Sequence, residues 1–186
     1  MNRNETLRDL SSETSRVKIV QMTDLPQLVS AFQRRSHSVG FIGGCFDVLH
    51  IGHIEVFRFA RKYVDCLCVV LDNDTSIRNN KGSGRPVFNQ QIRSEQIAEL
   101  ESVSLVTVWD KDIPSDLELA NQRWHSLLES CRPDVLITNS EADPYWREKL
   151  ARCNILGMQF LDCHLKRLTS STELVDSLGD NLAQLN

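Results

Sequence analysis

Residues 39–53 read VGFIGGCFDVLHIGH, and the amphipathic stretch EVFRFARKY follows at residues 55–63. The apolar run at the start predicts a buried strand, the glycines predict a turn, and the amphipathic stretch predicts a helix. Glycines let a backbone approach a ligand closely, and the first turn of a helix offers free N–H groups and a positive dipole end. The stretch therefore indicates a phosphate site between a strand and a helix.

Short apolar runs and amphipathic segments alternate along the rest of the chain. The expected strands are 39–42, 66–71, 105–108, 135–138 and 158–161. The expected helices lie near 25–35, 53–63, 89–100, 117–130, 145–152 and 172–178. Nearly continuous apolar strands separated by helices are typical of a parallel sheet that is covered on both faces. We therefore expect an α/β fold, a Rossmann-like doubly wound five-stranded parallel sheet with helices on both faces.

A chain of 186 residues fits one compact domain. Residues 1–16 carry little apolar periodicity, so we expect a flexible N-terminal segment there. Residues 17–186 are expected to form a single domain, with a leader strand and helix over 17–38 and a core over 39–178. The glycine-containing stretch 79–86 is expected to be a loop.

Composition excludes several classes of protein. The net charge of −4 argues against a general nucleic-acid binder, which would carry a basic excess. No apolar run approaches the roughly 20 residues of a membrane helix, and the polar N-terminus does not resemble a signal peptide, so we expect no membrane partner and a cytoplasmic protein. The six cysteines form no CxxC pair and lie mostly in apolar stretches, which favours buried free thiols over a redox or zinc role.

His50 and His53 lie three residues apart across a glycine at the start of the expected helix. Two imidazoles in this position can donate to one phosphate and stabilise charge that develops on its oxygens. Two other interpretations apply to an isolated pair: a helix cap with a buried imidazole, or a metal site. No Cys, Asp or Glu nearby completes a convincing set of metal ligands.

The whole string from Gly43 to His53 resembles the GxFDxxHxGH motif of the nucleotidyltransferase superfamily, whose HxGH element is shared with class I aminoacyl-tRNA synthetases. The GCFD variant is most similar to the nucleotidyltransferase domain of the ADP-heptose synthases. In that family Asp74 and the loop KGSGRPV (81–87) match a D…KGxxRPV pattern, and Arg93 matches an arginine of the next helix. RPDVL (132–136) and Ser170-Ser171-Thr172 match its RPDxLV and STT elements.

Physical chemistry gives these motifs a second interpretation. Residues 75–94 hold four basic side chains and no Asp or Glu, which provides a local positive field for phosphates or, alternatively, a solvated basic loop. Ser170 and Glu173 fit a capping box, which would explain the serine without a ligand. The chain also departs from the family at residues 139–145, which read NSEADPY where the relatives carry KGGDY, so the resemblance leaves the base and the acceptor open.

The resemblance implies transfer of a nucleotidyl group from a nucleoside triphosphate to a phosphorylated acceptor, with release of pyrophosphate. The implied catalytic residues are His50, His53 and Lys81. The implied nucleotide-binding residues are Gly43, Gly44, Cys45, Phe46, Asp47, Gly52, Ser170, Ser171 and Thr172. Asp74, Arg85 and Arg93 are the implied binding residues for the substrate and its phosphates. Asp47 is expected to orient its loop. No residue is assigned to a metal, because Mg²⁺ would be held mainly by the nucleotide phosphates.

The expected substrates are ATP and a sugar 1-phosphate such as heptose 1-phosphate. The first alternative is a CTP-dependent cytidylyltransferase acting on glycerol 3-phosphate or phosphoethanolamine. The alternative from another class is a non-catalytic nucleotide-binding regulatory protein. Related enzymes commonly form dimers, so a homodimer is a further expectation from the resemblance.

Overall fold

The computed structural model describes residues 16–166 and 169–183 of the chain. The segment expected to be flexible, residues 1–16, lies outside this part except for its last residue. Among the described residues no helix has both the length and the apolar character that a membrane span requires.

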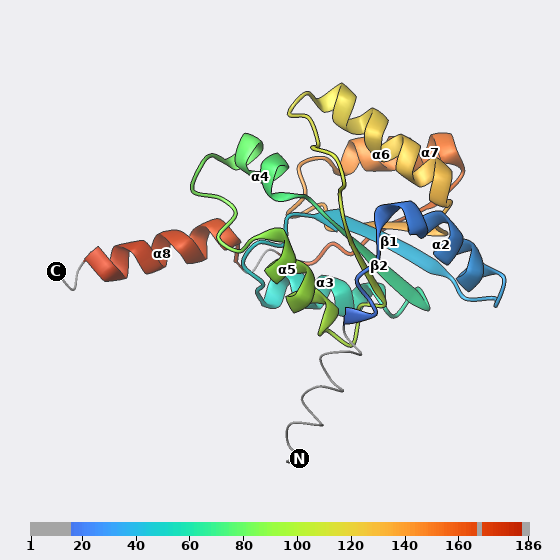
Figure 1. The fold of residues 1–186 in the computed structure, drawn as a ribbon, viewed down its shortest axis with the longest axis horizontal. Coiled ribbons are helices and arrows are strands. Elements are labelled where there is room, and N and C mark those ends of the chain that lie inside the picture. The colour runs from blue at the N-terminus through green and yellow to red at the C-terminus, as the bar shows by residue number, and fades with distance from the viewer. Residues whose placement is uncertain (1–15, 167–168, 184–186) are drawn as a thin grey trace, which may run out of the picture.

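Five parallel strands form one sheet in the order β3-β2-β1-β4-β5 (Figure 1). They are β1 (Val39–Gly44), β2 (Cys66–Leu71), β3 (Leu105–Val108), β4 (Val135–Thr138) and β5 (Gln159–Asp162). Each agrees within two residues with an expected strand, and the predicted parallel sheet is confirmed. The strand order reverses between β1 and β4, so the carboxyl ends of these two strands flank the switch point where open sheets of this kind bind ligands.

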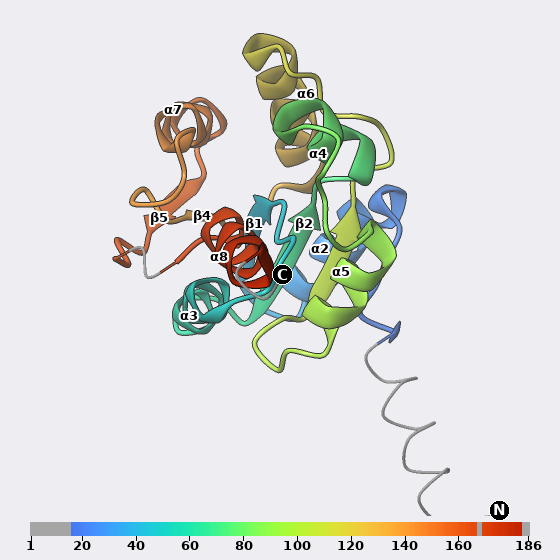
Figure 2. The same cartoon turned by 90° about the vertical axis from the view of Figure 1, so that its left-hand side faces the viewer.

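Helices cover both faces of the sheet, as expected (Figure 2). They are η1 (Met22–Asp24), α2 (Leu25–Gln33), α3 (Ile51–Ala60), α4 (Asp74–Lys81), α5 (Gln90–Ala98), α6 (Leu117–Cys131), α7 (Trp146–Leu156) and α8 (Ser171–Ala183).

The interior strand β2 is buried along its whole length because both of its faces are covered. Leu67, Val69 and Leu71 pack with α3 and α5 on one face. The alternate residues Cys66, Cys68 and Val70 pack with α2, α6 and α7 on the other face. The period of two along this strand therefore builds two separate cores.

The structure corrects two expectations about secondary structure. Residues 17–20 form no strand, because Ile19 makes only a single bridge to Val106 at the edge of the sheet. The first part of the expected loop is helix α4, which ends at Lys81. Its sequence, DTSIRNNK, has little apolar periodicity. The helix is started instead by Asn73, whose side chain accepts from the backbone N–H of Ser76 (2.8 Å).

The cysteine prediction is confirmed: all six cysteines are free thiols. Five of them are buried, and Cys45 is half-buried. The two cysteines of β2, Cys66 and Cys68, point to the same face, as the period of two along a strand requires.

Arg93 of α5 is the largest fully buried side chain in the described part of the chain. Its guanidinium donates to the backbone oxygens of Cys45 (2.6 Å) and Asp72 (2.8 Å), which follow β1 and β2. It also donates to the oxygen of Phe88 (3.0 Å) and pairs with the Asp74 carboxylate (2.8 Å). Arg93 thus fastens together the loops that follow the two central strands.

Replacing Arg93 by Met should lower the free energy of unfolding by about 3–5 kcal/mol, because the Asp74 carboxylate and three carbonyl oxygens lose their donor. Urea denaturation measures the change. The exposed Arg78 on α4 provides the control, and Arg78→Met should change the same quantity by less than about 0.5 kcal/mol. A loss below about 1 kcal/mol in Arg93→Met would mean that these contacts do not hold the loops.

Candidate active site

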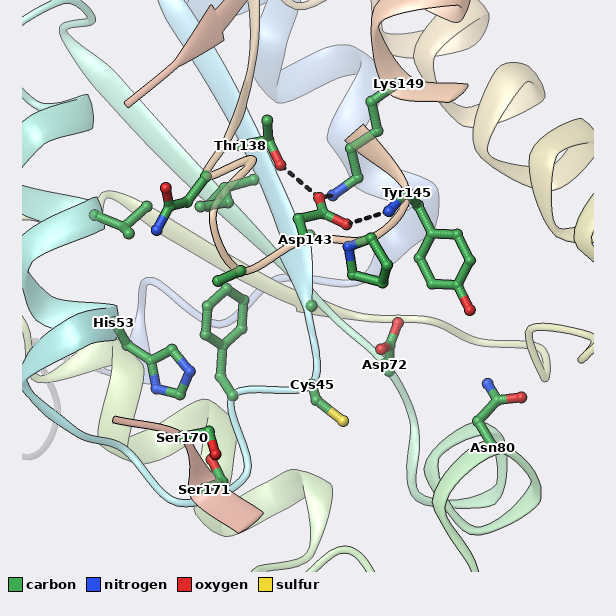
Figure 3. Close-up of a pocket in the computed structure, with 18 of the residues that line it drawn as sticks. Cys45, His53, Asp72, Asn80, Thr138, Asp143, Tyr145, Lys149, Ser170 and Ser171 are labelled. Carbon is green, nitrogen blue, oxygen red and sulfur yellow. Dashed lines mark hydrogen bonds and ion pairs between the residues drawn. The ribbon is translucent and has the colours of Figure 1, made fainter. Parts of the chain in front are cut away.

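A cavity of about 870 Å³ opens at the carboxyl ends of β1, β2 and β4. Its walls come from the β1–α3 loop, the end of α4, α6, the β4–α7 loop and the first turn of α8. Figure 3 shows His53, Ser170 and Ser171 on one side of the cavity and Thr138, Asp143 and Lys149 on the opposite side. Segments far apart in the sequence therefore meet around one space at the switch point of the sheet.

The rings of His50 and His53 are stacked, with centroids 3.8 Å apart and planes 25° from parallel. His50 is the N-cap residue of α3 in an extended conformation, and His53 lies one turn into the helix. Both side chains line the cavity. The two imidazoles therefore converge on one space, as the interpretation of the HxGH element requires.

Gly52 makes this stack possible. A Cβ atom at this position would lie 3.0 Å from both Cε1 and Nδ1 of His50, closer than side chains normally approach. Gly43 has a comparable role at the end of β1, where a Cβ would lie 2.2 Å from the ring of Trp124. The two glycines leave room for the two aromatic groups that flank the turn.

His53 is held as a neutral imidazole. Burial first, and then the charges of His50 and Lys81, lower its pKa from 6.5 to about 3. Its ring packs against that of Phe46 in a T-shaped arrangement, with the ring centroids 5.1 Å apart. Its Nδ1 atom is buried without a hydrogen-bond partner among the described residues. A neutral imidazole can donate one hydrogen bond to a phosphoryl oxygen and carries no charge that must be neutralised first.

The first turn of α8 faces the histidines. Ser170, Ser171 and Thr172 line the cavity. The predicted capping box is present: Ser170 Oγ accepts from the N–H of Glu173 (3.2 Å), and the Glu173 carboxylate accepts from the N–H of Ser170 (2.9 Å). Hydroxyls at a helix N-terminus, beside its positive dipole end, form a site suited to an anion.

Lys81 and Cys45 lie on the floor of the cavity with Asp72, which follows β2. Burial raises the pKa of the Cys45 thiol, while the neighbouring Lys81 acts in the opposite direction. Burial likewise raises the pKa of Asp72, although Lys149, Arg93 and Lys81 lie close enough to lower it in part. The cavity lining therefore includes one ammonium and one carboxylate in addition to the histidine pair.

The structure brings eleven of the fifteen predicted site residues around the cavity. They are Gly43, Gly44, Cys45, Phe46, His50, Gly52, His53, Lys81, Ser170, Ser171 and Thr172. The other four, Asp47, Asp74, Arg85 and Arg93, do not line it, and their assignment to nucleotide or phosphate remains a prediction.

Asp47 anchors the neighbouring loop, in agreement with its expected orienting role. Its buried carboxylate accepts from the backbone N–H groups of Val87 and Phe88 (3.0 Å each) and pairs with Arg85 Nε (3.0 Å). Arg85 in turn reaches the backbone oxygen of Ser171 (3.5 Å). The pair therefore connects the β1–α3 loop, the 82–88 loop and the start of α8.

The sequence interpretation missed several cavity residues. Asp72 comes directly after β2, and that position alone could have indicated it. Trp124 of α6 gave no signal, because a tryptophan at helical spacing looks like a core residue. Most of the residues that replace the KGGDY pattern line the cavity, and Asp143 among them pairs with Lys149 (2.5 Å). Burial alone would raise the pKa of Asp143, but Lys149 and three hydrogen bonds hold it below its ordinary value.

Among the described residues no three His, Cys, Asp or Glu side chains gather as metal ligands. Asp72 nevertheless offers one carboxylate on the cavity floor. Mg²⁺ accepts one or two protein carboxylates when substrate phosphates and waters complete its shell. The donor set therefore fits a magnesium ion that arrives with a nucleotide.

Fold and site together define the class of protein: an α/β nucleotidyltransferase with its HxGH element at the carboxyl edge of a parallel sheet. The chain belongs to the cytidylyltransferase-like family, whose model matches residues 41–177.

Relatives in this family include the bifunctional protein HldE of Nitrobacter hamburgensis, 38% identical over 125 residues, which are 67% of this chain and 24% of that protein. The bifunctional protein HldE of Caulobacter vibrioides is 32% identical over 166 residues, 88% of this chain and 32% of that protein. The chain thus spans about a quarter to a third of the length of these two relatives.

Solved structures share the fold. A lipopolysaccharide core biosynthesis protein from Thermoplasma volcanium matches with a TM-score of 0.54 and 24% identity, over 68% of this chain and 95% of that one. Pantoate–β-alanine ligase from Francisella tularensis matches with a TM-score of 0.59 and 14% identity, over 86% of this chain and 76% of that one. The predicted fold class is confirmed.

Substituting Gly52 by Ala should separate activity from stability. Alanine favours a helix by up to about 1 kcal/mol over glycine, so thermal stability should stay or rise. The added Cβ must displace the His50 ring, and a misplaced catalytic group of this kind should lower pyrophosphate release by about 10–100-fold. Gly84→Ala is the control, since a Cβ there meets nothing within 4 Å. Equal activity of the two variants would contradict the stacked geometry.

The free energy of unfolding should decrease as the pH is lowered, because of His53. Its pKa is about 3 in the folded protein against 6.5 as the ordinary value. Between these values the unfolded chain binds a proton that the folded protein does not, so acidification favours unfolding. From about pH 6.5 to 4.5 this group should remove roughly 2 kcal/mol of unfolding free energy. Urea denaturation at both pH values should show a smaller loss in His53→Gln, and an equal loss would exclude His53 as the cause.

Proposed function

We propose that this chain transfers a nucleotidyl group from a nucleoside triphosphate, preferably ATP, to a phosphorylated acceptor, a sugar 1-phosphate such as heptose 1-phosphate. The observation that carries the proposal is the stacked histidine pair, which faces the serine-lined first turn of α8 across one cavity. The family membership and the HldE relatives support the same reaction.

The reaction is a displacement at the α-phosphorus. An oxygen of the acceptor phosphate forms a new bond to this phosphorus, the bond to the β-phosphate oxygen breaks, and pyrophosphate leaves with the electron pair. The attacking oxygen is already anionic, so no general base is required. Catalysis then comes from alignment of the two substrates and from stabilisation of charge on the phosphoryl oxygens.

The residues divide these tasks. His50 and His53 bind the α-phosphate, and the first turn of α8 binds the β- and γ-phosphates through its hydroxyls and N–H groups. Lys81, at the end of α4, neutralises charge that develops on the transferring and leaving phosphates. A magnesium ion held by the nucleotide phosphates, with the Asp72 carboxylate within the same cavity, would supply further charge neutralisation.

A substrate screen tests the proposal. Pyrophosphate release is measured with magnesium and either ATP or CTP, against heptose 1-phosphate, glycerol 3-phosphate and phosphoethanolamine. Turnover with ATP and the sugar phosphate is the expected result. Turnover with CTP and a phospho-alcohol would replace it by the cytidylyltransferase alternative. Tight nucleotide binding without turnover on any acceptor would favour the non-catalytic alternative.

In the active combination, His53→Ala should lower turnover by about 10²–10³-fold, the scale for one donor that stabilises charge in a transition state. The half-buried His125 of α6 lies outside the cavity lining, and His125→Ala should leave turnover unchanged. Circular dichroism verifies that both variants are folded. Comparable turnover of wild type and His53→Ala at saturating substrates would remove this histidine from the mechanism.

A further inference from the structure

The cavity has a second polar end, away from the histidines, between α6 and α7. We define this α6–α7 end by Asn121 and Trp124 on α6 and Lys149 and Arg152 on α7, all of which line the cavity. Figure 3 shows Lys149 and its partner Asp143 across the cavity from Ser170 and Ser171. The proposed triphosphate site does not use this end.

Arg152 carries a buried charge that no direct ion pair neutralises among the described residues. The residue is only 5% exposed, and its guanidinium donates from Nη2 to the amide oxygen of Asn121 (2.5 Å). It makes no ion pair with any carboxylate of the described residues. Burial lowers the pKa of Arg152, while Cys153 and the carboxylate of Glu148 act in the opposite direction and only in part offset the burial.

The acid nearest in sequence acts on Arg152 through its charge but forms no ion pair with it. Glu148 lies one turn earlier on α7, where an i, i+4 pair with Arg152 would be the ordinary arrangement. Its Oε2 atom is instead buried with no hydrogen-bond partner in the described structure, and no ion pair joins the two side chains.

Lys149 provides the contrast on the same helix. Its ammonium is paired with Asp143, whose same oxygen also accepts from Thr138 Oγ1 (2.5 Å). The charge of Lys149 is therefore balanced within the protein. Arg152, one turn further along α7, lines the cavity without an ion pair to any described carboxylate.

A buried charge costs several kcal/mol unless it is paired, and such a charge in a cavity wall indicates a candidate ligand-binding residue. The planar guanidinium binds phosphate and carboxylate groups through two parallel hydrogen bonds. We infer that the α6–α7 end binds an oxyanion of the acceptor substrate, a phosphate or a carboxylate, with Arg152 as the residue that recognises it. The assignment of this oxyanion to the acceptor substrate rests on the proposed function.

The division of the cavity assigns this oxyanion to the acceptor. The triphosphate is already matched by the histidine pair and by the N-terminus of α8, on the far side from α7. The acceptor must bring its phosphate to the α-phosphorus from the remaining space. The apolar side chains of Leu117, Ala120 and Trp124 line that space and would cover the uncharged part of the molecule.

Inorganic phosphate is the probe for the first test. In a nuclear magnetic resonance titration of the full chain, the Nε–H signal of Arg152 is assigned by its loss in Arg152→Gln. We expect this signal to shift saturably with phosphate. The signal of Arg147, an exposed arginine of the same helix that lies over the ring of Trp146 (4.4 Å), should not shift. An Arg152 signal that phosphate leaves unmoved in the folded protein overturns the inference.

Affinity gives a second readout through the backbone amide signals of α7. In Arg152→Gln these signals should need about tenfold more phosphate for half-saturation, the scale for one charged hydrogen-bonding partner. Arg147→Gln removes the same charge from the same helix and should titrate like the wild type. Equal phosphate affinity in wild type and Arg152→Gln would overturn the inference as well.

Thermal unfolding separates recognition from a structural role. Without an anion, Arg152→Met should unfold at the same temperature as wild type or higher, because it no longer buries a charge without an ion pair. With phosphate, the wild type should gain stability and the variant should not. A variant that is less stable by the same amount with and without phosphate would assign Arg152 to the core.

Two sugar phosphates identify the source of the oxyanion. Glucose 1-phosphate and glucuronate 1-phosphate differ only by a carboxylate, and both are titrated against the α7 signals. If Arg152→Gln weakens both to the same extent, Arg152 holds the phosphate. If it weakens only glucuronate 1-phosphate, Arg152 holds a second acid. Binding that is unchanged for both overturns the inference.

These measurements need no turnover, so the two proposals fail separately. A protein in which phosphate shifts the Arg152 signal but no substrate pair releases pyrophosphate would contradict only the proposed function. An active enzyme with an unresponsive Arg152 would contradict only the inference.

Discussion

The close contact between the rings of His50 and His53 is the constraint on which the rest of the site depends. It requires an extended residue at the N-cap of α3, a helical residue one turn later and a glycine between them. The stack also sets the electrostatics of the turn, because a buried imidazole beside another and beside Lys81 stays neutral. Geometry and protonation state thus follow from one arrangement of four residues.

Buried ion pairs and hydrogen bonds to backbone carbonyls hold this arrangement in place together with the apolar core. Arg93 joins the ends of β1 and β2, and Asp47 with Arg85 joins the β1–α3 loop to the start of α8. Both arginines belong to the basic stretch that in the sequence looks like one phosphate-binding surface. In the fold the basic residues of this stretch have different surroundings. Arg93 is buried and hydrogen-bonded within the protein, whereas Lys81 lines the cavity.

A cation that forms an ion pair within the protein stabilises the fold. A cation that lines a cavity without an ion pair can bind a ligand. Lys149 and Arg152 stand one turn apart on α7 and fall on opposite sides of this distinction. The same criterion separates the histidine end of the cavity from the α6–α7 end. The β4–α7 loop, where the chain departs from the KGGDY pattern of its relatives, supplies Asp143 to this region.

Much of the fold could be predicted from the sequence. The strand positions could be predicted because short continuous apolar runs are typical of strands that are buried on both faces. The stretch of strand, glycines and histidines indicated which edge of the sheet binds a ligand. Helix α4 could not be predicted this way, because its start depends on the Asn73 cap and not on an apolar stripe. The helix expected near residues 25–35 is present as α2, whereas residues 17–20 form only the single bridge of Ile19 to Val106 in place of a strand.

The sequence by itself determined the chemistry at the ends of strands, since the residue types and spacing of the HxGH element, the capping box and the glycines are local properties. Only the tertiary structure decided which charged side chains share a space. Arg93 and Arg152 are both buried arginines on helices, and nothing in their neighbours along the chain tells them apart. One meets a carboxylate and two carbonyl oxygens brought from other segments, besides the nearby carbonyl of Phe88, and the other meets an amide and an open cavity. That difference arises from contacts across 19 to 48 positions in the first case and 31 in the second, and such contacts exist only once the sheet has formed.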